Sequence, residues 1–277
     1  MVDNPVSCEI IAIGNELLIG DVQDTNTHWL IQQLTGLGGF VRRCWIVRDE
    51  FPAIAGALHA AVDAETALII TSGGLGPTGD DLTLAAVAAA FDLPLGVHAE
   101  AMAMLERRYG ELARSGWVST PELNDARKKM AMFPHGAEAV YNPVGGAPAA
   151  LLRVRASRIV CLPGVPPELK SIFTTSMTPL LSGLFGGAAY QIRSVIVSCQ
   201  DESSMASQLQ EVVERHPRVY IKSRAMRTGP GGGIKVTFSA NGPDVRTVDL
   251  LLGSAQDDLR TTLATIGLSS TDEPGPK

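Results

Sequence analysis

The chain has 277 residues, of which 45% are hydrophobic and 19% are charged, a composition typical of a folded protein with one large or two medium domains. The formal net charge of −6 argues against general nucleic-acid binding, which normally requires a basic face, but not against a small anionic ligand. No apolar run reaches the ~20 residues that span a bilayer, and residues 1–9 lack a secretory signal pattern, so we expect a cytoplasmic protein without membrane contact.

The first part of the chain alternates segments typical of strands with segments typical of helices. Short apolar and β-branched runs predict strands, and apolar residues at helical spacing predict helices. This alternation favours βαβ units and a mainly parallel sheet that helices cover on both faces. The predicted strands are 7–13, 40–47 and 67–71, and the predicted helices are 26–37, 52–62 and 82–91.

The next region predicts a different order of elements. Residues 94–132 are expected to be mostly helical, and 149–154 and 158–162 to pair as antiparallel strands, before Pro166 starts a helix that runs toward Leu184. Three residues at helical spacing are expected to pack in the core without a cofactor role: Met102, Leu105 and Tyr109.

A stretch of small residues, 182–189, precedes a change of composition. The strand, helix, strand, strand, helix order that follows predicts a small α+β domain. We therefore expect one domain over 1–181, a second over 190–268 and a disordered tail over 269–277. The segment 228–233 could hold a phosphate or connect a hairpin, and the lack of a following helix favours the hairpin. The elements of the second domain are expected at 191–198, 203–215, 218–224, 233–240 and 245–266.

The cysteines and histidines carry no metal-site or nucleophile pattern. Cys8, Cys44, Cys161 and Cys199 are isolated in apolar, strand-like segments, which predicts buried free thiols. The five histidines are scattered and have no partner at zinc-site spacing.

Three polar segments follow the first three predicted strands, and the first and third of them contain glycines. In an open parallel sheet, ligands bind beyond the carboxyl ends of the strands, so we expect these segments to converge on one site. The candidate residues that they contribute are Gly14, Asn15, Glu16, Asn26, Asp49, Ser72, Gly73, Gly74, Gly76, Pro77, Thr78, Asp80 and Asp81.

The third segment, TSGGLGPTGDDLT, combines flexible backbone with a helix start. Gly73, Gly74 and Gly76 let backbone N–H groups approach an oxyanion, and the helix expected near Asp81 directs its positive end to the same space. The segment matches neither the GxGxxG fingerprint nor a P-loop, because no Lys follows the glycines. It predicts an anion-binding loop.

Two adjacent aspartates beside such a loop admit two interpretations. Asp80 or Asp81 could cap the helix, a role for which one aspartate is enough. Both together would repel a phosphate unless a divalent cation bridged carboxylate and phosphate, as Mg²⁺ commonly does. Asp49 and Glu16 could support that cation or could simply be solvated at strand ends.

Two further glycine–proline clusters, 142–148 and 162–168, are explained singly as turns. Together they favour the rigid walls of one pocket, with Glu168 in the first turn of a helix. Their candidate residues are Asn142, Gly145, Gly146, Ala147, Pro148, Pro163, Gly164 and Glu168.

Four ordered motifs carry a family resemblance: AIGNELLIGDVQDTNTHWL, SGGLGPTGDDLT, NPVGGAPAALL and LPGVPPEL. Over about residues 8–181 the chain resembles the competence/damage-inducible protein A (CinA) family, whose N-terminal domain is similar to the molybdopterin-binding fold of MogA and MoaB and to a domain of FAD synthase. The part after Gln191 resembles a ferredoxin-like or KH-like module more weakly. The resemblance implies a three-layer α/β/α domain with a mixed sheet, and a symmetric dimer or trimer.

The resemblance also implies roles for individual residues. Gly73, Gly74, Gly76, Pro77 and Thr78 would contact phosphate, Asp81 and Asp49 would be the key acids, and 145–148 would line the opposite wall. Three departures stand out. Gly79 replaces a usual Lys, and Gly146 and Ala149 replace the Thr and last Gly of the wall motif. Relatives often continue into a nicotinamide-mononucleotide deamidase domain, which we do not expect here.

Three functions follow as hypotheses. The first is metal-dependent hydrolysis of a nucleotide pyrophosphate such as ADP-ribose or FAD, with Mg²⁺, Mn²⁺ or Co²⁺ held by Asp81 and by Asp49 or Asp80. The second is binding or adenylylation of molybdopterin on the same loop. The third is a non-catalytic binding or assembly protein, for which RNA binding is disfavoured by the acidic charge.

Overall fold

The computed structural model describes residues 5–186, 189–226 and 233–273. They form two compact units, of which the first combines Val6–Leu34 with Gly39–Gly186 and the second contains Thr35–Gly38 and the described residues from 189 onward. Within the described residues, no helix combines the length and the apolar character that crossing a membrane requires.

The first unit is built on a six-stranded mixed sheet in the order β2-β1-β3-β8-β7-β6. The four strands β2, β1, β3 and β8 are parallel, and β7 and β6 continue the sheet antiparallel. The strand bounds are β1 Ser7–Ile13, β2 Phe40–Val47, β3 Leu68–Ser72, β6 Glu138–Val140, β7 Ala149–Val154 and β8 Ser157–Leu162. The predicted α/β/α class with a mixed sheet is confirmed.

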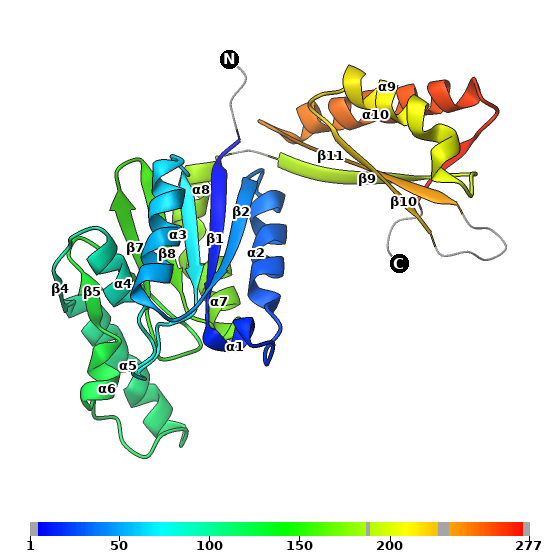
Figure 1. Cartoon of the computed structure of the whole chain (residues 1–277). Coiled ribbons are helices and arrows are strands. Elements are labelled where there is room, and N and C mark those ends of the chain that lie inside the picture. The colour runs from blue at the N-terminus through cyan, green and yellow to red at the C-terminus, as the bar shows by residue number, and fades with distance from the viewer. Residues whose placement is uncertain (1–4, 187–188, 227–232, 274–277) are drawn as a thin grey trace. The chain divides into compact units, whose positions relative to one another are not determined.

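Helices lie on both sides of this sheet (Figure 1). On one side α3 and α4 pack with side chains of β1, β3, β7 and β8 in one apolar core that includes Ile11, Leu58 and Ile159. On the other side α2 packs against the segment after α7, where Trp29 meets Phe173 edge-on at 5.4 Å. The bounds are α1 Asn15–Leu18, α2 Thr25–Gly36, α3 Phe51–Asp63, α4 Thr83–Ala90, α7 Pro166–Ser171 and α8 Thr178–Phe185, with a π-helical turn at Ile172–Ser176.

The edge strand β2 is less covered than the other parallel strands of the sheet. Five of its eight residues are exposed and the other three are half-buried. Cys44 is one of the exposed residues, so the expectation that all four thiols are buried is wrong. Two arginines, Arg42 and Arg43, lie on this edge, where charged side chains discourage pairing with another chain. Cys8 and Cys161 are buried, and burial raises the pKa of the Cys8 thiol to about 12.

Residues 94–132 are less helical than predicted. The long helix α5 Ala99–Arg114 and the short helix α6 Asp125–Lys129 are flanked by β4 Leu95–Val97 and β5 Met132–Pro134, which pair antiparallel. Strands of three residues carry too short a pattern to be recognised in a sequence. Leu105 lies in the core as expected, with Met102 and Tyr109 half-buried against it.

The second unit has the order strand, helix, strand, strand, helix, strand, with sheet order β10-β11-β9-β12, which is the ferredoxin-like arrangement. Its two helices pack on one face of the sheet through a core that includes Phe238, Leu252 and Leu259. The bounds are β9 Ala189–Val197, α9 Ala206–Arg215, β10 Tyr220–Ala225, β11 Ile234–Gly242, α10 Val245–Ala264 and β12 Ser270–Asp272, with a 3₁₀ turn at Glu202–Met205.

The prediction that residues 269–277 are disordered is wrong for residues 270–272. Residues 270–272 form β12, which pairs with the end of β9. The segment Ser270–Asp272 is polar, so nothing in its composition separates it from a loop. Residues 274–277 and most of the glycine segment 228–233 lie outside the described residues.

Candidate functional site

A cavity of about 420 Å³ opens at the carboxyl ends of the parallel strands. It lies where β1, β3 and β8 end and the following loops begin, which is the position expected for a ligand site in an open α/β sheet. Fourteen of the predicted site residues line it: Gly14, Glu16, Asp49, Gly73, Gly74, Gly76, Pro77, Asp80, Asp81, Gly146, Ala147, Pro163, Gly164 and Glu168. All five glycine- or carboxylate-bearing segments therefore meet at one cavity.

The loop after β3 requires glycine at two successive positions. Gly73 and Gly74 have φ of 113° and 68°, a region that favours glycine. A Cβ at Gly73 would collide with the backbone oxygen of Ile13, and one at Gly74 with the hydroxyl of Thr83. Thr83 closes the loop because its Oγ1 donates to Gly73 O at 2.7 Å and its N–H donates to Gly74 O at 3.1 Å.

The helix after the loop begins later than predicted, which changes the role of the aspartates. Helix α4 begins at Thr83, and Leu82 precedes it without any side-chain cap. Asp81 Oδ2 instead accepts from Thr78 N–H at 2.9 Å and Thr78 Oγ1 at 2.5 Å. Asp80 Oδ1 is 2.5 Å from the same hydroxyl. Neither aspartate caps the helix, so the capping interpretation is wrong.

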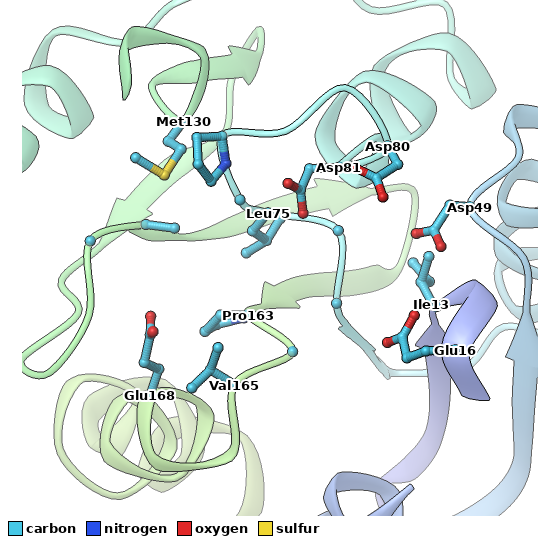
Figure 2. A pocket seen from close by; sticks show the side chains of 18 of the residues that line it. Ile13, Glu16, Asp49, Leu75, Asp80, Asp81, Met130, Pro163, Val165 and Glu168 are labelled. Carbon is cyan, nitrogen blue, oxygen red and sulfur yellow. The ribbon is translucent and has the colours of Figure 1, made fainter. Parts of the chain in front are cut away.

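Four carboxylates gather at one side of the cavity (Figure 2). Asp49 Oδ2 accepts from Asn15 N–H at 2.8 Å, which fixes its position after β2. Burial raises the pKa of Asp49, and the charges of Glu16 and Asp80 raise it further, against the opposing effect of the Asn15 hydrogen bond. Mutual repulsion of this kind makes the Glu16, Asp49, Asp80 and Asp81 side favourable for a cation.

The fit of a metal ion depends on the ligand as well as on the protein. The described residues contain no group of three or more His, Cys, Asp or Glu side chains that could hold a metal ion alone. Mg²⁺ and similar ions commonly use one or two carboxylates and complete their shell with water and substrate phosphate oxygens. A pair made of Asp81 and either Asp49 or Asp80 fits this pattern, in which the ion and the phosphate bind together.

A cation that the sequence did not reveal reaches the glycine loop from helix α6. Lys129 Nζ donates to Asp81 O at 2.8 Å and to Thr78 O. Its positive charge also contributes to lowering the pKa of Asp80, after the hydrogen bond from Thr78. Because Lys129 lies 48 residues from Asp81, no local pattern could have identified it.

The wall of the cavity opposite the four carboxylates is formed by residues of the 142–148 and 162–168 segments. Asn142, which is 3% exposed, joins these two segments through hydrogen bonds. Its Nδ2 donates to Glu168 Oε2 at 2.7 Å and to Ala147 O at 2.9 Å, and its Oδ1 accepts from Gly145 N–H at 2.8 Å. Asn142 therefore shapes the wall and does not line the cavity, contrary to the prediction that it contacts the ligand. Burial raises the pKa of the Glu168 carboxyl, with the Asn142 hydrogen bond and the Arg108 charge opposing.

Asn26 and Ser72 likewise lie beneath the site. Asn26 Nδ2 donates to Ser72 Oγ at 3.1 Å and to Gly164 O at 2.7 Å, which joins the start of α2 to the loops after β3 and β8. Both side chains are buried, so they position the loops and do not line the cavity. Four other predicted residues border the cavity without lining it: Asn15, Thr78, Gly145 and Pro148.

The remaining lining residues were not predicted to contact a ligand. Four of them are apolar residues that adjoin predicted site residues in the sequence or belong to the core: Ile13, Leu75, Met130 and Val165. The fifth is Tyr109, which was expected to pack in the core without contacting a ligand. Gly146 lies opposite Tyr109, since a Cβ at Gly146 would be 3.3 Å from Tyr109 Oη. Gly79 has no atom within 4 Å of such a Cβ, so a side chain there would enter open space.

Comparison with known proteins agrees with this architecture. The sequence model of the family described as "Probable molybdopterin binding domain" matches residues 9–183. Protein PH0439 of Pyrococcus horikoshii is 37% identical over 210 residues, which cover 76% of this chain and 81% of that protein. Protein PAE0875 of Pyrobaculum aerophilum is 41% identical over 214 residues, 77% of each chain.

A solved structure is similar over the same region. The crystal structure of the protein CinA from Thermoplasma acidophilum, described as having unknown function, aligns with a TM-score of 0.57 and 32% identity. The alignment covers 63% of this chain and 98% of that one. The chain belongs to the family of the probable molybdopterin-binding domain.

Proposed function

We propose that the glycine-loop cavity binds a phosphorylated small molecule and hydrolyses a nucleotide pyrophosphate with the help of a divalent cation. One observation carries this proposal: the glycine loop and four carboxylates, Glu16, Asp49, Asp80 and Asp81, line the same cavity. A phosphate at the loop would face strong repulsion from these carboxylates, which a divalent cation between them would remove.

The glycine loop and the aspartates have different roles in the proposed hydrolysis. We assign the backbone N–H groups of Gly74 and Gly76 to one phosphate, because both residues line the cavity and neither carries a side chain that would shield its backbone. Asp81 together with either Asp49 or Asp80 would hold Mg²⁺, Mn²⁺ or Co²⁺. When bound, such an ion neutralises phosphate charge and lowers the pKa of a coordinated water.

The test is hydrolysis of ADP-ribose and FAD with and without each of Mg²⁺, Mn²⁺ and Co²⁺. We expect cation-dependent release of nucleoside monophosphate, and loss of that activity in Asp81→Ala and in Asp81→Asn, which keeps an oxygen for Thr78. Asp63→Ala is the matched control, because Asp63 pairs with Arg155 on the surface away from the cavity. Unchanged hydrolysis in both Asp81 variants would eliminate the proposed mechanism.

A second candidate function is molybdopterin binding or adenylylation, which the family match over 9–183 favours. The same loop would hold the pterin phosphate. Calorimetric titration with molybdopterin separates the candidates, because a pyrophosphatase need not recognise a pterin. Micromolar binding without hydrolysis of ADP-ribose or FAD would favour this second candidate.

We further propose that the protein acts in the cytoplasm as a CinA-type homo-oligomer. The similarity to the Thermoplasma CinA structure supports the CinA-type assignment. Sedimentation velocity measures the number of subunits, and a monomer at micromolar concentration would contradict the oligomer.

A further inference from the structure

Lys129, the last residue of α6, provides a positive charge beside the glycine loop but does not line the cavity of about 420 Å³. It lines a second cavity of about 100 Å³, together with Gly74, Gly76 and Asp81 of the loop. These three loop residues line both cavities, so the loop lies between Lys129 and the ligand space. Lys129 therefore acts on a bound ligand through the loop and not by direct contact.

The ammonium group of Lys129 holds the backbone of this loop at two points. Nζ donates to Asp81 O at 2.8 Å and to Thr78 O. None of the ion pairs between described residues includes Lys129, so its charge does not serve a carboxylate. Hydrogen bonds from a charged donor are shorter and stronger than those from a neutral donor. Lys129 thus ties α6 to the loop at the carbonyl groups of Thr78 and Asp81.

The two residues that Lys129 holds are the ones that fix the Asp81 carboxylate. Asp81 N–H donates to Thr78 O at 3.3 Å, which closes a turn over 78–81. In return, Thr78 N–H donates to Asp81 Oδ2 at 2.9 Å, and the Thr78 hydroxyl lies 2.5 Å from the same oxygen. The backbone of Asp81 and the donor to its side chain are therefore both anchored by Lys129. Without the ammonium group, the turn and the carboxylate on it could move together.

The position of Lys129 has opposite consequences for a cation at the aspartates. Its positive charge repels a divalent ion, which by itself would weaken binding of that ion. Its hydrogen bonds hold a carboxylate in place, which reduces the entropic cost of ordering that carboxylate when the ion binds. Removing the ammonium group therefore tightens ion binding if the charge dominates. It weakens ion binding if positioning dominates.

We propose that Lys129 is a positioning residue that holds the Asp81 carboxylate where a divalent cation and a phosphate meet. This rests on the proposed function, in which Asp81 is a ligand of the cation. Lys129 is half-buried, so water weakens the repulsion between its charge and the ion, whereas its two hydrogen bonds act directly on the turn. Positioning therefore outweighs repulsion, and loss of the ammonium group should weaken cation binding.

The test measures the Mn²⁺ affinity of the full chain by electron paramagnetic resonance in the presence of α,β-methylene ADP-ribose. The methylene bridge of this analogue resists hydrolysis, so binding is measured without turnover. Lys129→Met keeps the length of the side chain but removes all of its N–H donors. We expect the dissociation constant for Mn²⁺ to rise about tenfold, because two charge-assisted hydrogen bonds are lost. Lys129→Arg keeps charged donors and should bind Mn²⁺ within about twofold of the wild type.

Lys128→Met is the matched control, because it removes the same charge from the neighbouring residue. The Lys128 side chain is 54% exposed, and its ion pair among the described residues is with Asp125 at 4.0 Å. The substitution should change the Mn²⁺ affinity less than about twofold, as expected for an exposed surface pair. Thermal melting establishes that each variant is folded. Should Lys129→Met not fold, Lys129→Gln, which lacks the charge and is one bond shorter, takes its place with an expected loss of about threefold.

The outcomes separate this proposal from the proposed function. Mn²⁺ binding by folded Lys129→Met, or by its replacement Lys129→Gln, that is as tight as in the wild type or tighter would overturn the role of Lys129. An equal loss in Lys128→Met would overturn it as well. A loss in Lys129→Met but not in Lys128→Met, in a protein that does not hydrolyse ADP-ribose, would support Lys129 and overturn only the hydrolysis. Absence of Mn²⁺ binding by the wild type would overturn both.

Discussion

Two glutamates at opposite ends of the same sheet illustrate how the protein uses buried charge. Glu9 lies near the amino end of β1, and its side chain is 0% exposed. It accepts hydrogen bonds from Arg43 Nε and Nη2 at 3.1 Å, Trp45 Nε1 at 3.0 Å and Thr66 Oγ1 at 2.9 Å. Glu168 follows the carboxyl end of β8 and accepts from Asn142 alone among the described residues.

The pKa shifts of these two carboxyls have opposite signs. Burial raises the pKa of Glu9, but the hydrogen bonds from Arg43, Trp45 and Thr66 and the Arg43 charge outweigh burial and lower it overall. For Glu168, burial dominates and the pKa is raised. A carboxylate that the protein satisfies itself serves stability, whereas one left with free lone pairs in a cavity is available to a ligand.

The largest effect that this contrast predicts concerns the carboxylates at the cavity. Asp49→Asn removes one charge that would hold the cation, so hydrolysis of ADP-ribose or FAD should fall about 100-fold, or about 2.7 kcal/mol of transition-state stabilisation. Because Asp49 is repelled by Glu16 and Asp80, the melting temperature should not fall. Steady-state kinetics and thermal melts measure the two effects. A lower melting temperature with unchanged hydrolysis kinetics would contradict this prediction and would show that Asp49, like Glu9, serves stability.

The second prediction concerns the other end of the sheet. Glu9→Gln replaces an accepting oxygen with an NH₂ donor that faces Trp45 and Thr66. The free energy of unfolding should therefore fall by about 2 kcal/mol, and nucleotide binding should not change. Chemical denaturation measures the loss, and the exposed Glu138→Gln is the matched control.

The stability difference between the wild type and Glu9→Gln should depend on pH. Because the folded pKa of Glu9 is below its unfolded value, its contribution is complete above the unfolded value of about 4.5 and disappears as pH falls through the folded pKa. The stability gap between the wild type and Glu9→Gln should therefore narrow between about pH 5 and pH 3. A gap that stayed constant over this range would contradict the ionised, hydrogen-bonded carboxylate.

A smaller effect is expected from adding a cation to the loop. Gly79 has open space around it and a φ outside the left-handed region, so Gly79→Lys should fold without strain. The added charge should tighten ADP-ribose binding about three- to fivefold at low salt and less at high salt. Gly56→Lys, on the exposed side of α3 where nothing lies within 4 Å, is the control. An equal gain in the control would show that the loop is not the phosphate site.

The smallest effect concerns the stability contribution of Glu168. Its folded pKa is above the unfolded value, so the native state binds more protons between the two and stability falls as pH rises through that window. Glu168→Gln lacks this loss and should gain stability relative to the wild type from about pH 4 toward neutral pH. Denaturation at several pH values measures it. A relative loss would mean that the ionised carboxylate is satisfied, as Glu9 is.

The sequence predicted the elements that have strong local patterns. Apolar runs marked β1, β3 and β8, and the glycines after β3 marked the loop whose positive φ angles require them. The start of α4 was predicted to within one residue, but the role of the Asp pair before it was not, because both carboxylates contact the Thr78 hydroxyl and neither caps the helix.

What the sequence did not reveal depends on contacts between distant residues. Lys129 reaches the loop from 48 residues away, and Asn142 was expected beside the ligand but lies beneath the wall. Glu9 lies within an apolar run, and its partners Arg43, Trp45 and Thr66 become neighbours only through the pairing of β1 with β2 and β3. Such pairings follow from topology and not from spacing along the chain.

The central claim is that the glycine loop binds the phosphate of a small molecule. The most direct test is to follow backbone amide resonances by ¹H–¹⁵N NMR while titrating ADP-ribose with Mg²⁺. The account predicts that the largest shift changes occur at Gly73, Gly74 and Gly76, at the cavity end of the sheet. Saturable changes confined to residues of the second unit, with these three amides unmoved, would contradict it.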